Sequence, residues 1–180
     1  MRKPFDLSVE IPSGVHASFS NGVLELKKGS VDLKRKISIL GTEIKVSDGK
    51  INLNCLKANK KNVADVKAIV SHVKNMFIGL NEKYVYKLEI CHVHFPMTCK
   101  VEGKKLVINN FLGEKKNRYA EILHGVDVEV KGNVITVSSH DLEKAGQTAA
   151  NLEVASKVHG KDRRVFQDGI FITEKPGRRE

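Results

Sequence analysis

The chain has 180 residues, and 31 Lys and Arg residues against 21 Asp and Glu residues give it a net charge of +10. Hydrophobic residues make up 41% of the chain and charged residues 29%. These proportions are typical of a packed globular protein and exclude a chain that is disordered throughout. The positive charge favours a polyanionic partner, either nucleic acid or a membrane surface.

The first residues lack an apolar segment, and no run of about 18 apolar residues occurs, so neither a secretory signal nor a membrane-spanning helix is expected. Three cysteines are too few, and odd in number, for a disulfide framework, which indicates a reducing compartment. We therefore expect a cytoplasmic protein that does not associate with a membrane.

An internal repeat divides the chain. At an offset of 84 residues Pro12 matches Pro96, Gly29 matches Gly113 and Gly41 matches Gly125. Tandem similarity of this kind predicts two homologous halves. We expect an N-terminal repeat domain over residues 1–82 and a C-terminal repeat domain over residues 83–180, the second with a basic extension.

The first half contains the pattern of strands followed by a helix. Residues 23–26 form a short apolar strand, and residues 43–46 and 51–55 alternate in polarity on either side of an Asp48-Gly49 turn, as in a β-hairpin. A helix over 63–77, capped by Asn62, presents one apolar stripe.

The second half repeats this order. Residues 105–108 form a strand, residues 126–130 and 134–137 form a hairpin, and Ser139 or Asp141 caps a helix that ends near Lys157. Residues 84–90 form a strand of either half. The fold class expected is α+β, with two tandem homologous domains, each an antiparallel sheet with one helix packed on one face.

Two groups of residues resemble chemical sites in content. Cys91, His92, His94 and Cys99 have zinc-ligand side chains, but on one strand the histidines would face away from Cys91. The adjacent Ser139, His140 and Asp141 cannot converge as a catalytic relay and are better explained as a helix cap. We expect ordinary strand residues at 91–99, no metal, no cofactor and no enzymatic activity.

Arginine is concentrated at the C-terminal end. Four of the seven arginines lie within residues 163–180, in a segment that the first half does not have. Arg offers a planar fork that suits phosphate oxygens. The basic residues Lys157, His159 and Lys161 extend the same surface.

Four segments together resemble large-subunit ribosomal protein six in its archaeal and eukaryotic branch, whose eukaryotic members are called protein nine. They are FPM at 95–97, NFLGEK at 110–115, GQTAAN at 146–151 and RVFQDGIFI at 164–172. The resemblance covers essentially the whole chain, including its duplication.

The resemblance implies a structural constituent of the large ribosomal subunit that binds large-subunit ribosomal RNA through its C-terminal half. The site implied is near the sarcin–ricin loop and the stalk base, with neighbouring ribosomal proteins as partners and translation factors nearby. The contacts implied are Lys157, His159, Lys161, Arg163, Arg164, Lys175, Arg178 and Arg179, with Lys115, Lys116 and Arg118 as a second cluster. Phe166 is expected in the core, and Asp168-Gly169 in a turn.

The residues themselves leave a second function open. In that alternative the chain is a non-enzymatic protein–protein interaction module that uses its sheet faces, and its charge serves only solubility. Binding to RNA that weakens steeply with salt would separate the two, because displaced counterions impose that dependence.

Overall fold

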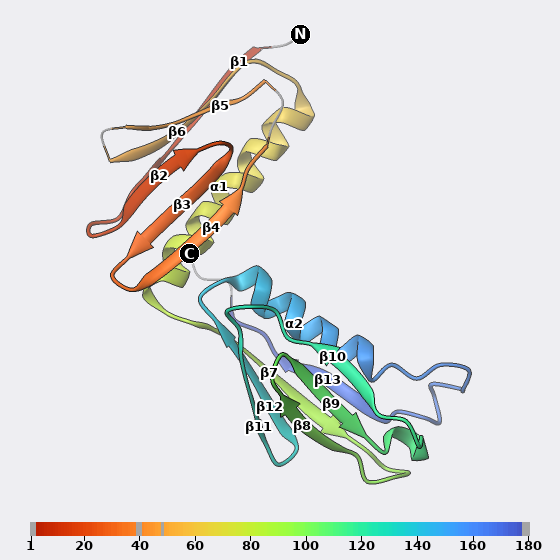
Figure 1. Cartoon of the computed structure of the whole chain (residues 1–180). Helices are drawn as coiled ribbons and strands as arrows, with labels where there is room; N and C mark the ends of the chain where they lie inside the picture. The colour runs from red at the N-terminus through yellow and green to blue at the C-terminus, as the bar shows by residue number, and fades with distance from the viewer. Residues whose placement is uncertain (1–2, 39–40, 48, 178–180) are drawn as a thin grey trace. The chain divides into compact units, whose positions relative to one another are not determined.

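The computed structural model describes residues 3–38, 41–47 and 49–177. The chain forms two compact units, Met1–Glu82 and Lys83–Glu180, called unit 1 and unit 2 below. Both consist of antiparallel strands followed by a helix (Figure 1), so the predicted α+β class is confirmed. No helix within the described part of the chain is long and apolar enough to cross a membrane.

Unit 1 has six strands and one helix. They are β1 (Lys3–Glu10), β2 (His16–Ser20), β3 (Val23–Lys28), β4 (Val31–Lys36), β5 (Glu43–Ser47), β6 (Lys50–Ala58) and α1 (Lys60–Asn81). The strands form two three-stranded sheets, β1-β6-β5 and β2-β3-β4. The predicted arrangement of antiparallel strands with one helix is present, and the structure adds that the strands are divided between two sheets. The helix contacts strands of both sheets, and this common packing gives the unit one core.

The α1 helix begins earlier than the sequence pattern predicts. Its cap is Asn59, whose side-chain oxygen accepts a hydrogen bond from the Asn62 amide at 2.8 Å. The predicted cap, Asn62, therefore lies inside the first turn. In the predicted stripe, Val66, Ile69, Val73 and Phe77 are buried. The helix also continues past Phe77 to Asn81, where it adds Leu80 to the core.

Unit 2 repeats this plan and adds one strand. Its elements are β7 (Tyr84–Cys91), β8 (Thr98–Glu102), β9 (Lys105–Asn109), the short helix η1 (Phe111–Gly113), β10 (Arg118–Glu121), β11 (Asp127–Lys131), β12 (Val134–Ser139), α2 (Leu142–Ala155) and β13 (Gly169–Glu174). Its sheets are β11-β12-β7-β13 and β10-β9-β8. The sheet β5-β6-β1 of unit 1 thus corresponds to β11-β12-β7, and β13 is the addition.

The landmarks of the repeat occupy equivalent turns. Gly29 separates β3 from β4 and Gly113 separates β9 from β10, with φ of 57° and 76°. Gly41 precedes β5 and Gly125 precedes β11, with φ of 75° and 83°. Positive φ is readily adopted only by glycine, so the same backbone requirement recurs in both units. Asp48, the first residue of the predicted Asp48-Gly49 turn, lies outside the described residues.

In unit 2 the structure decides between two pairs of predicted alternatives and corrects two predictions. Residues 84–90 belong to unit 2, where β7 lies between β12 and β13. The helix α2 is capped by Asp141 and ends at Ala155, two residues before the predicted Lys157. The segment 91–99 is not one strand, because β7 ends at Cys91 and a loop over 92–97 precedes β8.

The added strand is held on both sides. One edge of β13 pairs antiparallel with β7, with Ile170 opposite Ile90. On its other side the Ile170 amide donates to the Ser156 hydroxyl oxygen at 2.8 Å. That hydroxyl in turn donates to the Glu153 carbonyl in the last turn of α2 at 3.1 Å. Ser156 therefore joins the end of α2 to β13, and both flank the segment 157–168.

We expect Ser156→Ala to destabilise unit 2 by about 1–3 kcal/mol, because it leaves the buried Ile170 amide without its acceptor. The chain has no Trp and all three Tyr residues lie in unit 2, so tyrosine fluorescence during urea unfolding measures this unit alone. Ser138→Ala, which removes a half-buried hydroxyl from β12, is the control. Equal effects of the two substitutions would contradict the assignment.

Candidate nucleic-acid interface

Three loops meet at one end of unit 2 (Figure 1): residues 92–97, 110–118 and 157–168, called the three-loop surface below. The Asn110 side chain donates to the Pro96 carbonyl at 2.9 Å. The ring of Phe95 lies against Gly113, which has no Cβ to obstruct it. The first two loops therefore pack on one another, and the third is joined to both by the contacts below.

Arg118 connects the second loop to the end of α2. Its Nη1 donates to the carbonyls of Ala155, at 3.1 Å, and Lys157, at 2.9 Å, while its Nε donates to Glu114 at 2.8 Å. The guanidinium also lies 4.1 Å from the centre of the Phe111 ring. Free carbonyls at the C-terminal end of a helix attract cations, so Arg118 stabilises this end of α2.

Glu114 brings the two predicted basic clusters together. Its pKa is lowered first by the hydrogen bond from Arg118, against the opposing effect of burial, and also by the charges of Arg118, His159 and Lys161. His159 and Lys161 belong to the third loop and Glu114 to the second. The two basic clusters, which lie about 40 residues apart in the sequence, are therefore close enough in the fold for both to act on the Glu114 carboxylate.

Asp168 holds the third loop to the first. Its side chain is only 2% exposed, and its carboxylate accepts from the Val93 amide at 3.3 Å and from the His94 amide at 3.2 Å. The Nδ1 of His94 lies 2.8 Å from the other carboxylate oxygen. Burial acts to raise the pKa of Asp168, but the hydrogen bonds from His94 and Val93 outweigh it and lower that pKa.

Phe166 completes this junction. Its ring stacks on the ring of His94 with centroids 4.8 Å apart, and the Lys161 ammonium lies 4.6 Å from the ring centre. The residue is half-buried in this junction, so its predicted place in the core is wrong. The predicted Asp168-Gly169 turn is wrong as well, because Asp168 is a buried acceptor and Gly169 begins β13.

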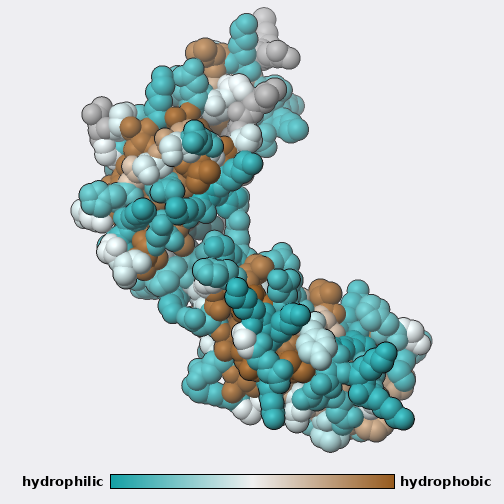
Figure 2. Space-filling view, viewed as in Figure 1, coloured by the Kyte–Doolittle hydropathy of each residue, from teal (hydrophilic) through white to brown (hydrophobic). Residues whose placement is uncertain are grey.

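Most of the predicted contact residues are exposed on the three-loop surface, which is mainly hydrophilic in the view of Figure 2. These are Lys115, Lys116, Lys157, His159, Lys161, Arg163 and Arg164. The Arg164 guanidinium contacts the Asp162 carboxylate at 2.9 Å but remains 89% exposed, so it can still reach a ligand.

The remaining predicted contact residues lie away from the three-loop surface, have their donors engaged within the protein, or fall outside the described residues. Lys175 is exposed but follows β13 at the end remote from the three-loop surface, since the first residue of β13 pairs with Cys91 beside that surface. Arg118 is on the three-loop surface, but its donors are engaged by protein acceptors. Arg178 and Arg179 fall outside the described residues.

The residues with enzyme-like content have structural partners. Ser139 donates to the Gly125 carbonyl at 2.7 Å, and Asp141 accepts from the first amides of α2. Burial raises the pKa of the Cys99 thiol to about 11. Burial, with the charges of Glu89 and Asp168, also raises the pKa of the Cys91 thiol. Both thiols therefore stay protonated at neutral pH, which does not suit nucleophilic attack.

Sequence reasoning missed the residues that assemble this surface. His94 and Asp168 lie 74 positions apart, and no local period connects them. The only signal was the position of Asp168 itself, an acid in a basic segment directly before the apolar residues that begin with Ile170.

The fold and this surface define a class: an α+β protein of two similar units, one of which presents an exposed basic surface. The family model described as "Ribosomal protein L6" matches residues 95–169. A protein named large ribosomal subunit protein uL6 from Sulfurisphaera tokodaii is 43% identical over 168 residues, covering 93% of this chain and 90% of the relative.

Two further relatives carry the same name. That of Methanosarcina mazei is 43% identical over 97% of this chain and 99% of its own length. That of Methanococcus vannielii is 42% identical over 94% of this chain and 93% of its own length. The chain therefore belongs to the ribosomal protein L6 family, and the resemblance drawn from its motifs is confirmed.

We expect Arg118→Ala to destabilise unit 2 by about 1–3 kcal/mol, because two carbonyls and Glu114 lose a charged donor. Lys115→Ala, at an exposed side chain of the same loop, should change stability by less than about 0.5 kcal/mol. Urea unfolding followed by tyrosine fluorescence compares the two. An unchanged stability for Arg118→Ala would show that its internal contacts are dispensable.

Asp168 should make unit 2 sensitive to acid. Because its folded pKa is depressed, its contribution is complete above the unfolded value of about 3.9 and is lost as pH falls through the lower folded value. Asp168→Asn should therefore cost stability at pH 7 and flatten the loss of stability between about pH 5 and pH 2. Urea unfolding across this range measures both, and an unchanged pH dependence would refute the assignment.

Proposed function

We propose that the three-loop surface binds large-subunit ribosomal RNA near the sarcin–ricin loop and the stalk base. Membership of the family supports the general function, that of a structural constituent of the large ribosomal subunit. The cytoplasmic location expected from the sequence agrees with it. The RNA site and its position in the subunit are the proposal.

One observation carries the proposal: unit 2 brings seven exposed basic side chains from two separate segments onto one rigid surface. The acidic side chains among them have partners, since Glu114 is held by Arg118, Asp162 by Arg164 and Asp168 by His94. The remaining Lys and Arg side chains therefore present a net positive field. Such a field attracts the phosphates of RNA and releases their counterions.

The mode of contact follows from the shape of RNA helices. The major groove of A-form RNA is too narrow for side chains, so proteins contact its phosphates and its shallow minor groove with 2′-hydroxyls. Exposed Lys and Arg on loops held in place by Arg118 and Asp168 suit such contacts. We propose Lys157, His159, Lys161, Arg163, Arg164, Lys115 and Lys116 for the surface itself, with Lys175, Arg178 and Arg179 as contacts beyond it.

Arg118 has a different role in this proposal. Because its donors are used inside the protein, it positions Lys115, Lys116 and Lys157 rather than serving as a primary phosphate ligand. The implied neighbours, other ribosomal proteins and translation factors, would then contact parts of the chain that the RNA leaves uncovered.

The test is the salt dependence of binding between the full chain and large-subunit ribosomal RNA. Arg163→Ala with Arg164→Ala should weaken binding at least about tenfold, since hydrogen bonds to charged groups contribute about 1.5–3 kcal/mol each. The slope of log affinity against log salt should fall by about 1 for each phosphate that the variant no longer neutralises. The unfolding of unit 2 should change little.

The matched control removes two exposed lysines from unit 1, Lys45→Ala with Lys50→Ala, which changes the net charge by the same amount. A decrease in affinity equal to that of the arginine pair would mean that total charge, and not the three-loop surface, determines binding. Affinity that is insensitive to salt would instead favour the protein-interaction alternative.

A further inference from the structure

We propose that a cavity beside the three-loop surface receives one unstacked base of the bound RNA. This inference rests on the proposed function and deepens it, because it adds a base-recognition site to contacts that otherwise involve only the RNA backbone. Sequence-specific recognition of RNA takes place largely through bases that have left the helical stack.

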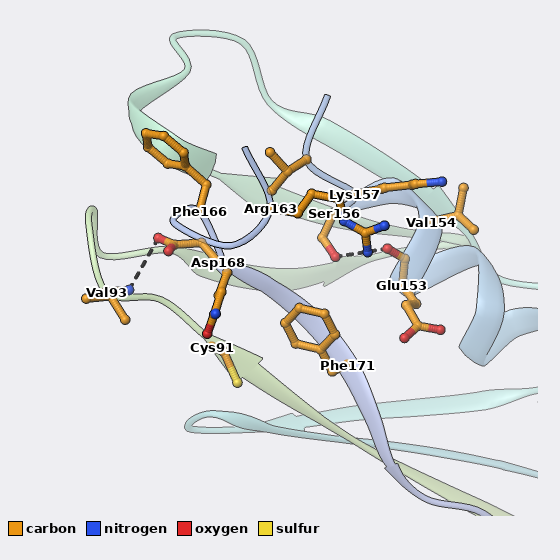
Figure 3. Close-up of a pocket in the computed structure, with 12 residues that line it drawn as sticks. Cys91, Val93, Glu153, Val154, Ser156, Lys157, Arg163, Phe166, Asp168 and Phe171 are labelled. Carbon is orange, nitrogen blue, oxygen red and sulfur yellow. Dashed lines mark hydrogen bonds between the residues drawn. The ribbon is translucent and has the colours of Figure 1, made fainter. Parts of the chain in front are cut away.

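The cavity has a volume of about 790 Å³ and lies between the ends of β7 and α2, the third loop and β13 (Figure 3). Its walls are mainly apolar and include Val93, Val154, Phe166 and Phe171. Ligand pockets of roughly 300–1,000 Å³ hold small organic molecules, so a nucleotide base with part of its sugar fits this space.

Exposed apolar side chains surround the opening. Val93 is 86% exposed and Val154 65% exposed, and Phe171 is also exposed. These apolar residues lie beside Lys157 and Arg163 of the three-loop surface, which line the same cavity. Single exposed apolar residues are common on protein surfaces, but these three line the same cavity, and apolar lining is a feature of ligand pockets.

Two cations stand at the same cavity. Lys157 and Arg163 line it, and Figure 3 shows Arg163 entering from the third loop while the Phe171 ring rises from β13 on another side. A flat base can stack on an aromatic ring and on a guanidinium plane, and its phosphate can pair with the ammonium. The cavity thus combines an aromatic ring and a guanidinium, which can stack on the base, with an ammonium that can pair with the phosphate.

The acidic groups near the cavity do not prevent this. The Asp168 carboxylate accepts a hydrogen bond from the Val93 amide, as Figure 3 shows, and also accepts from the His94 amide. Glu153, at the end of α2, is the other carboxylate in the lining. It lies one turn from Lys157 and can accept from the amino group of a base.

The cavity is formed before any ligand binds. Ser156 holds β13 to the end of α2, and Asp168 holds the third loop to the first, so three walls are fixed by internal hydrogen bonds. A preformed site avoids the entropy cost of ordering loops on binding. Charge complementarity favours a nucleotide over an apolar segment of a neighbouring protein, for which Lys157 and Arg163 would be unpaired.

The first experiment measures the affinity of the full chain for large-subunit ribosomal RNA after Phe171→Leu, which keeps an apolar side chain but removes the ring. Removal of one stacking interaction should lower affinity about 5- to 100-fold and leave the salt slope unchanged. The control is Tyr119→Leu, which removes an exposed aromatic ring from β10 and should change affinity less than about twofold. Thermal unfolding followed by circular dichroism confirms that both variants fold.

The outcomes separate this inference from the proposed function. Unchanged affinity for Phe171→Leu together with weaker binding for Arg163→Ala and Arg164→Ala would overturn the base site alone. Unchanged binding for both would overturn the proposed function. A reduced salt slope for Phe171→Leu would overturn the base site too, because the ring would then be acting on the phosphate contacts.

A second experiment does not depend on RNA affinity. The four ribonucleoside monophosphates, added separately to the isotope-labelled chain, should shift the amide signals of Val93, Ser156 and Phe171, whereas ribose 5-phosphate should not. Equal shifts with ribose 5-phosphate, or none with any nucleotide, would refute the site.

The third experiment asks what fills the cavity in the assembled subunit. Replacing Val154 with the photoreactive p-benzoylphenylalanine should give a crosslink to ribosomal RNA. A crosslink to a ribosomal protein would overturn the proposal and assign the cavity to a protein segment.

Discussion

The buried carboxylate of Asp168 is the interaction on which the functional surface depends. It is almost inaccessible to water, so its charge must be compensated by the amides of Val93 and His94 and by the His94 ring. These contacts are directional, and they fix the third loop against the first at the point where β13 begins. The exposed basic side chains of the third loop lie on the segment that ends at this point.

Arg118 and Ser156 act in the same way at the other boundary of the third loop. Both satisfy backbone groups around the end of α2, which a helix cannot satisfy by itself. A long basic segment would otherwise lose much conformational entropy on binding RNA, and its affinity would fall accordingly. Internal hydrogen bonds thus remove part of that entropy cost before binding.

A segment that unit 2 adds after its helix carries much of this surface. Both units have six strands followed by a helix, and glycines at equivalent positions make their turns. Only unit 2 continues past its helix, and the strand β13 that follows pairs with the edge of β7. The connection to that strand is the third loop, so the basic loop and the extra strand occur together in unit 2.

The sequence by itself determined the elements, their order, the duplication and the basic segment, because strand alternation, helical periodicity and glycine turns are local properties of the chain. It also led to the family, through motifs such as RVFQDGIFI. Only the tertiary structure decided that each unit has two sheets, that Asn59 rather than Asn62 caps α1, and that Arg118 serves the protein. It also joined His94 to Asp168 and formed the cavity lined by Phe171. Apart from the cap at Asn59, which is a contact with Asn62 three positions along the chain, those features depend on contacts between residues far apart in the chain, and no local pattern encodes such contacts.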